Sequence, residues 1–416
     1  MTHSPLPPPP LPPRGVTPLA RREARLAWGL LAPTLISVAL VVVIPLLAIF
    51  WISFKPIGLA DLRPPAPILR ESLRGSGDSL RIEYRLRNSS QDKVIENVVI
   101  TDTLPTDLTV TGDLPAGCAL TGRDLRCAFD QLEGGYNERL RIPVAAADED
   151  AAEEAAEGSE PLVSGEADSI LTNFEFSTEN FARIFDSDEF IAVMRVTLFY
   201  TVFGTIGALG VGLFAALLLN KSFKGQGILR GLYLFPYVAP VIAVAFSWLI
   251  LFDPFSGSAN ALLIRMGVTE GAINFFGERP LALIMVTVFE IWRYFPLSFL
   301  FILARMQSID TDMYEAADMD GASPFQKFWY LSLPQLLGIL SVLFLLRFIW
   351  TFNKFDDIFL LTGGNAGTRT LTVNVYEQAF AISNIGAGAA VAVVIFLCLL
   401  SFSVFFFRFM SREEGL

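Results

Sequence analysis

Apolar residues gather in six long runs along the 416-residue chain, and polar loops separate them. Each run is long enough for an α-helix to cross a bilayer, which takes ~20 residues. The expected spans are residues 28–54, 190–219, 231–252, 281–303, 334–352 and 388–409. The pattern therefore predicts an all-α, multi-pass membrane protein.

The first apolar run has two interpretations. Arg21, Arg22 and Arg25 precede it, and a basic flank is also typical of a secretory signal peptide. The run at 28–54 is longer than the ~7–15 apolar residues of such a peptide and ends without a small-residue cleavage site. An uncleaved membrane helix is favoured, and residues 1–27 are expected to be a disordered, proline-rich cytoplasmic tail.

Basic residues between the spans predict the orientation through the positive-inside rule. One side carries Arg21, Arg22, Arg25, Lys221, Lys224, Arg230, Arg305, Lys327 and Arg412, and the other Arg265, Arg279, Lys354 and Arg369. Six helices with both termini in the cytoplasm fit this bias. The polar insert between the first two spans is then outside the cell membrane.

Charge and composition narrow the function. The net charge is −11, but residues 55–190 hold 13 basic and 27 acidic side chains while the rest of the chain is slightly basic. No basic stripe for nucleic acid is evident. One histidine and three cysteines argue against histidine catalysis and the usual zinc sites. No phosphate-binding Gly-x-x-x-x-Gly-Lys motif occurs, so neither an enzyme nor a cofactor on this chain is expected.

The insert shows a β pattern at residues 66–145. Leu80, Ile82, Tyr84 and Leu86 alternate with charged residues, as in a half-buried strand. The segment NSSQDKVIENVVITDTLPTDLTV and the cysteines after it resemble immunoglobulin-like β-sandwich modules of bacterial surface proteins. Such modules often carry a cysteine pair here, so a Cys118–Cys127 disulfide is implied, with two free thiols as the alternative. Residues 146–185, rich in Ala, Asp and Glu, are expected to be a solvated acidic linker.

The loop at residues 305–333, between the fourth and fifth spans, is too structured to be a mere connector. Alanine-rich sequence up to Met319 favours a helix, and Gly321 suits the left-handed residue that ends one. Ser323 and Pro324 are a typical helix start. Two short helices meeting at a glycine are predicted, and an amphipathic hairpin at the membrane surface is the simplest interpretation.

A sharper interpretation comes from a motif in that loop. Glu315, Ala316 and Ala317 are followed by Gly321, and then by Leu331, Leu333 and Pro334. This spacing resembles the coupling loop of ABC importer permeases. In that family the loop docks into an ATPase subunit. The resemblance implies that Glu315 meets a basic group, Ala316 and Ala317 allow close approach, Asp320 belongs to the docking elbow and Gly321 makes its turn.

The resemblance extends over residues 31–407 and is to sugar importers of the maltose type. It implies the type I importer permease fold, with a five-helix core at residues 186–410. It also implies a second permease subunit in a heterodimer, two ATPase subunits that bind ATP, and an extracytoplasmic solute-binding protein. A bacterial inner membrane is the expected location.

Ionisable residues inside a span are costly and are functional candidates by default. Glu290 and Tyr294 share one helical face, as do Arg347, Thr351 and Lys354. By the resemblance, Glu290, Tyr294 and Leu297 face the sugar, and the other three occupy the matching positions on the next helix. A Glu290–Arg347 pair that only fixes helix packing is the alternative, while Arg293 and Lys354 can snorkel. Asp356 and Asp357 are expected to be solvated.

Three functions remain open at this stage. The first is a permease for di- or oligosaccharides such as α-glucosides. The second is a permease for a charged solute such as glycerol phosphate or a polyamine, which the charged side chains favour. The third, from another class, is a membrane receptor with an external ligand-binding domain.

Overall fold

The computed structural model describes residues 18–157, 159–186 and 188–413. The chain divides into two compact units, residues 1–51 and residues 52–416. Most of the expected tail lies outside the described residues. Its last part does not: helix α1 (Pro18–Val38) already begins at Pro18, so residues 18–27 are helical. The physical reason is that a first-turn proline and the strong helix formers after it start the helix early.

The described part of the first unit, residues 18–51, is one long helix. After α1 come a π-helical turn (Ala39–Val43) and α2 (Ile44–Ser53), which is shared with the second unit. The helical segment Arg22–Ser53 is 32 residues long, and no residue in its most apolar stretch is buried. A helix that exposes apolar side chains in this way suits a lipid environment.

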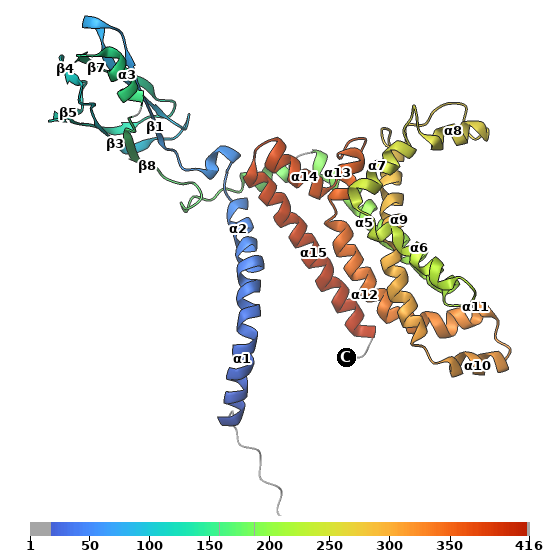
Figure 1. Ribbon diagram of the computed structural model, residues 1–416. Helices are drawn as coiled ribbons and strands as arrows, with labels where there is room; N and C mark the ends of the chain where they lie inside the picture. The colour runs from blue at the N-terminus through green and yellow to red at the C-terminus, as the bar shows by residue number, and fades with distance from the viewer. Residues whose placement is uncertain (1–17, 158, 187, 414–416) are drawn as a thin grey trace, which may run out of the picture. The chain divides into compact units, whose positions relative to one another are not determined.

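Residues 67–166 fold into two four-stranded antiparallel sheets (Figure 1). The strands are β1 (Pro67–Arg74), β2 (Arg81–Asn88), β3 (Ile95–Thr103), β4 (Leu108–Val110), β5 (Cys118–Thr121), β6 (Asp124–Leu132), β7 (Asn137–Ala146) and β8 (Leu162–Glu166). Their order is β1-β2-β7-β4 in one sheet and β5-β6-β3-β8 in the other. The kinship to immunoglobulin-like modules stays a prediction.

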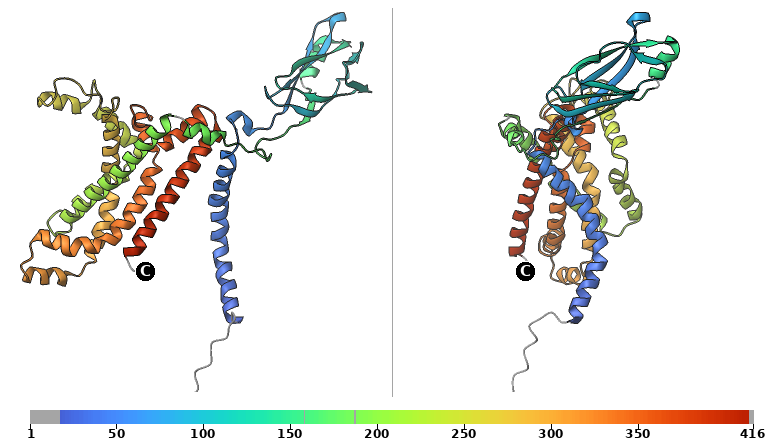
Figure 2. Two further views of the ribbon diagram at one scale, coloured as in Figure 1. Left: turned by 180° about the vertical axis from the view of Figure 1, so that it is seen from behind. Right: turned by 90° about the vertical axis from the view of Figure 1, so that its left-hand side faces the viewer.

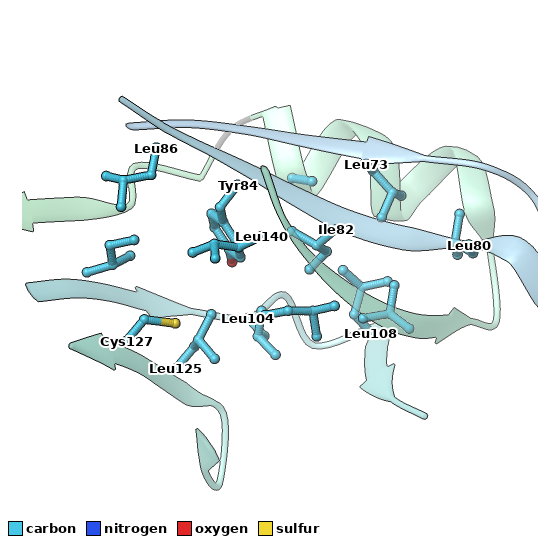
Figure 3. Packing of buried hydrophobic residues seen from close by; sticks show 14 of the residues in the cluster. Leu73, Leu80, Ile82, Tyr84, Leu86, Leu104, Leu108, Leu125, Cys127 and Leu140 are labelled. Atoms are coloured by element: carbon cyan, nitrogen blue, oxygen red, sulfur yellow. The ribbon is translucent and has the colours of Figure 1, made fainter. Parts of the chain in front are cut away.

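One apolar core lies between the two sheets (Figure 3). Ile82, Tyr84 and Leu86 point inward from β2, as their alternation predicts, and Leu125 and Cys127 meet them from β6. The alternating sequence thus places one face of each strand in a shared core, which stabilises the insert apart from the membrane helices.

The prediction of a solvated acidic linker at residues 146–185 is wrong for the first half of that range. Residues Glu149–Glu157 form helix α3, and Ala152 and Ala156 on it are buried in the core between the sheets. Strand β8 then pairs with β3. The acidic composition suggested a solvated segment, but Ala152 and Ala156, four residues apart, form a narrow buried stripe on one face of the helix. A further helix, α4 (Glu179–Phe185), precedes the membrane core.

The structure joins Cys118 and Cys127 in a disulfide. The two residues lie directly opposite each other in the β5–β6 pair. The bond therefore links neighbouring strands of one sheet, at the place that the resemblance implied.

Four long helices make up the membrane core and run side by side in the views of Figures 1 and 2. They are α5 (Asp188–Leu219), α9 (Leu281–Gln307), α12 (Leu333–Phe352) and α15 (Ile385–Glu413). Helix α5 packs along α9, and α12 contacts both. The shorter helices are α6 (Gln226–Val238), α7 (Val241–Leu251), α8 (Ser258–Arg265), α10 (Thr311–Met319), α11 (Pro324–Lys327), α13 (Asp356–Thr362) and α14 (Leu371–Tyr376).

Within the described residues, five helices are long and apolar enough to cross a membrane, or six if one bent pair counts as a span. That pair, α6 and α7, occupies the expected third span and bends by 92°. Pro240 stands at the bend and lacks the N–H that the carbonyl of Pro236 would accept from it in a continuous helix. The span expected over residues 231–252 is therefore not one continuous helix but a bent pair.

A polar junction ties together three segments that are distant in sequence. Lys55 is fully buried, and its Nζ donates to the carbonyl (2.5 Å) and the side-chain oxygen (2.6 Å) of Asn173. Asn180 donates to the carbonyls of Ser53 and Lys55. The amide of Gly386, at the start of α15, donates to the carbonyl of Ile57. We call residues 52–58, 173–180 and 383–386 the junction.

Candidate functional site

A buried ion pair lies where three core helices meet. Glu290 on α9 and Arg347 on α12 are each at most 2% exposed, and Nη2 of Arg347 is 2.7 Å from Oε1 of Glu290. Thr351 on α12 donates to the same oxygen at 2.9 Å, and Tyr200 on α5 donates to the other at 3.1 Å. These donors occupy lone pairs of both carboxylate oxygens, which helps to offset the cost of burying the charges.

Gly204 lets α5 approach this cluster. A Cβ atom at this position would lie 3.0 Å from Cγ of Glu290 and 3.4 Å from a methyl group of Thr351. Only glycine leaves the helices at their observed separation without displacing one of these side chains. The close approach explains how Tyr200, one turn earlier, reaches the carboxylate.

An aromatic and cationic corner lies beside the ion pair. Lys354, just after α12, donates to the hydroxyl of Tyr294 on α9, and its Nζ is 4.3 Å from the centre of that ring. The guanidinium of Arg347 lies 4.8 Å from the same ring centre. Tyr237 on α6 packs edge-on at 6.1 Å. Tyr294 is half-buried, so one part of this corner faces outward from the chain.

The charge of Lys354 is compensated nearby. Its Nζ lies 3.3 Å from Oδ1 of Asp356 and 3.8 Å from Oδ2 of Asp357. Asp356 is 44% exposed, whereas Asp357 is fully buried, so the expectation of two solvated carboxylates is wrong for Asp357. The N-terminal turn of α13 carries Asp357 inward against the helices.

Arg293 does not snorkel but holds the bend of the broken span. It is 7% exposed, and its guanidinium donates to the carbonyls of Pro236 and Ala239, both at 3.1 Å. These carbonyls lie at the end of α6, where the break leaves them without helical donors. Backbone polar groups at membrane depth need such internal partners.

Five of the six residues predicted for the substrate path therefore meet: Glu290, Tyr294, Arg347, Thr351 and Lys354. Leu297 lies one turn beyond Tyr294 on α9 and is half-buried. Sequence reasoning missed Tyr200, Tyr237 and Asp357. A stripe of polar and small residues on the second span, Thr197, Tyr200, Thr201, Gly204 and Thr205, was the signal for α5.

The loop between α9 and α12 forms the expected elbow. Helix α10 ends at Met319, Gly321 has φ +75°, and Ser323 caps α11 by accepting from Gln326. The elbow is pinned twice: Lys327 pairs with Asp318 at 2.5 Å, and the hydroxyls of Tyr314 and Ser332 are 2.9 Å apart. A π-helical turn (Phe328–Ser332) leads into α12.

The outer surface of the elbow is open. Glu315, Ala316, Asp320 and Gly321 are exposed, and Ala317 is half-buried. Met319, Phe325 and Tyr330 expose 88%, 70% and 78% of their surface. Large apolar side chains exposed close together in sequence are typical of a contact with a partner protein or a membrane surface.

A helical membrane core with a buried charged cluster, a broken span and a structured elbow defines a transport permease. Residues 208–412 match the family of binding-protein-dependent transport system inner membrane components. The chain is 35% identical over 219 residues to the inner membrane ABC transporter permease protein YcjO of Escherichia coli K12, which covers 52% of this chain and 74% of that protein. The chain therefore belongs to the ABC importer permeases, as the motif resemblance predicted, and is not an enzyme.

Two further comparisons support the same family and fold. The trehalose/maltose transport system permease protein MalF of Thermococcus litoralis is 32% identical over 230 residues, covering 55% of this chain and 77% of that protein. The crystal structure of a bacterial ABC transporter involved in alginate import aligns with a TM-score of 0.54 at 20% identity, over 58% of this chain and 85% of that one. The fold of the core is thus that of an ABC importer permease, in a multi-pass inner-membrane protein. The receptor alternative is not supported.

Proposed function

We propose that this permease imports an uncharged sugar, of the di- or oligosaccharide class. The observation that carries the proposal is that each cation of the cluster has a carboxylate partner within the chain. Glu290 pairs with Arg347, and Lys354 lies beside Asp356 and Asp357. An anionic solute such as glycerol phosphate needs a cation that is not already compensated, because burying an ion without a partner is costly.

The half-exposed ring of Tyr294 supports a sugar. Aromatic faces suit the apolar faces of sugar rings, and neighbouring hydroxyl and amino groups suit their hydroxyls. The relative from Thermococcus litoralis, by its name, transports trehalose and maltose. We place Tyr294, Leu297 and Lys354 along the solute path, and we assign Glu290, Arg347 and Thr351 to it as the polar cluster behind that ring.

The proposed assembly follows from the family. The chain pairs with a second permease subunit as a heterodimer, receives solute from an extracytoplasmic binding protein and is driven by two ATPase subunits that bind ATP. The elbow, with Glu315, Ala316, Ala317, Asp320 and Gly321, docks on an ATPase subunit. Both termini are then cytoplasmic and residues 67–166 lie outside.

Uptake of labelled solutes by a deletion strain tests the solute. The panel contains α-glucosides, other disaccharides, glycerol phosphate and a polyamine. We expect wild type to restore one uncharged sugar class, Tyr294→Ala to restore none, and Tyr294→Phe, which keeps the ring, to restore most of it. Rescue of glycerol phosphate or polyamine uptake alone would overturn the assignment of an uncharged sugar.

The same assay tests the elbow with Gly321→Asp. A Cβ at Gly321 meets no atom within 4 Å, and aspartate tolerates positive φ better than most residues, so the chain should still fold. We expect uptake to be lost. The matched control is Gly267→Asp, where φ is +70° and the space is equally open, at the loop after α8. Equal uptake by both variants would contradict the docking role.

A further inference from the structure

Seven arginines cover one outer face of the insert. Strands β1, β2 and β7 pair in register, so residues opposite each other share a face of the sheet. The outward positions hold Arg70, Arg74, Arg81, Arg85, Arg87, Arg139 and Arg141. Six of them are exposed and Arg81 is partly exposed. We call these seven residues the arginine face.

The arginine face has a single carboxylate among the outward positions of these three strands, all of which the structure describes. Glu83 is 8% exposed and lies 2.9 Å from Arg81, 3.4 Å from Arg141 and 3.7 Å from Arg139. The hydrogen bond from Arg81 and the three positive charges hold the pKa of Glu83 below its usual range. One carboxylate neutralises only one of the seven guanidinium charges, so the face keeps a strong positive charge.

The arrangement is costly for the fold. Arg70, Arg85 and Arg139 stand directly opposite one another on three neighbouring strands, at a strand spacing of about 4.8 Å. Like charges in this position destabilise a sheet. Residues 55–190 carry more acidic than basic side chains, and these could have paired with the arginines. Among the outward positions of the three strands, however, only Glu83 is acidic. The cost therefore points to a ligand. The sequence showed no basic stripe because alternate residues of three separate strands build it.

The size of the face limits what binds there. Three strands about 4.8 Å apart and four rows about 7 Å apart cover roughly 400 Å². A stable protein–protein interface needs about 800 Å² from each partner. The face is thus small for a protein partner and suits a short extended ligand.

We propose that the arginine face binds a short acidic oligosaccharide, with its carboxylates laid across β1, β2 and β7. Guanidinium groups bind carboxylates in a bidentate manner, and a chain with one carboxylate per sugar offers such groups in a row. All seven basic residues of the face are arginines, the side chain that this recognition uses. The proposal is independent of the solute that crosses the membrane core, because binding to the insert is measured directly.

Calorimetric titration of the full chain in phosphatidylcholine nanodiscs tests the proposal. The probe is oligogalacturonate, and an uncharged malto-oligosaccharide of equal length is the control. We expect binding of the acidic chain alone, weakening as salt rises. The variant Arg70→Gln/Arg85→Gln/Arg139→Gln should bind about tenfold or more weakly. The charge-matched variant Arg63→Gln/Arg126→Gln/Arg183→Gln, at exposed positions off the face, should bind as wild type does.

Thermal unfolding of the same two variants guards against misfolding. Relief of the like-charge row should leave the face variant at least as stable as the control variant. Equal affinity of both variants, or no oligogalacturonate binding by wild type, would overturn the proposal. Loss of wild-type binding when phosphatidylglycerol is added to the nanodisc would also overturn it, since lipid phosphates would then be the occupant.

Discussion

Glu290 shows how much one buried carboxylate depends on its partners. Its two oxygens accept from Arg347, Thr351 and Tyr200, which come from two other helices. Removing one member of such a buried pair leaves the other charge without compensation, which costs about 3–5 kcal/mol, whereas removing both costs much less.

We therefore expect Glu290→Gln and Arg347→Gln each to destabilise the chain by about 3 kcal/mol. The double variant should lose clearly less than the sum. Denaturant unfolding in detergent micelles measures the three free energies. Additive losses would show that the two side chains do not act as a pair.

Glu71 on β1 makes the stability of the insert depend on pH. Burial raises the pKa of this carboxyl from 4.5 to about 7, and the charge of Asp102 adds to the rise. The folded insert therefore keeps a proton that the unfolded chain has already lost between these values. Its stability should fall as pH rises from about 4.5 to about 7 and then level off.

The melting temperature of the full chain across this pH range measures the effect. Glu71→Gln removes the titrating group and keeps the shape of the side chain. The difference between wild type and Glu71→Gln should change steadily up to about pH 7 and little above it. A difference that does not vary with pH would contradict the burial of Glu71 in the folded insert.

At the scale of elements, the bend between α6 and α7 depends on two prolines and one arginine. Arg293→Met should leave the carbonyls of Pro236 and Ala239 without a side-chain donor, which costs about 1–3 kcal/mol. Pro240→Ala restores an N–H next to the bend. The loss caused by Arg293→Met should therefore be smaller in the Pro240→Ala background, as measured by unfolding in micelles. An equal loss in both backgrounds would show that Arg293 does not stabilise the bend through these carbonyls.

Sequence patterns predicted the elements wherever one signal dominates. Long apolar runs predicted the membrane helices, and Gly321 with Ser323 and Pro324 predicted the elbow. The pattern failed at residues 231–252, where an apolar run conceals a break. It also failed at α3, where acidic composition outweighed the buried Ala152 and Ala156.

The candidate site was predictable only along each helix. Helical spacing put Glu290 with Tyr294, and Arg347 with Thr351, on common faces. Contacts between helices, such as Tyr200 to Glu290, depend on how close α5 lies to α9, and Gly204 sets that distance in three dimensions. Asp357 was missed because its burial depends on the packing of α13 and not on its neighbours in sequence.

At the scale of the second unit, the junction connects residues 52–58, the segment that follows the insert and the start of α15. We expect Lys55→Met to increase hydrogen–deuterium exchange of residues 173–183, because Asn173 and the carbonyl of Glu175 lose a charged donor. Lys93→Met is the matched control, since it breaks a partly exposed pair with Asp61 that is worth little. Equal exchange in both variants would show that Lys55 does not hold the junction.

The junction also brings the two ends of the insert together. The amide of Ser177 donates to the carbonyl of Phe54 at 2.7 Å, so the chain leaves the core and returns to it at the same point. A module inserted there can be gained or lost in evolution without moving a membrane helix. The transporter can thus carry the insert as an accessory module, while selection on the helices that move solute proceeds separately.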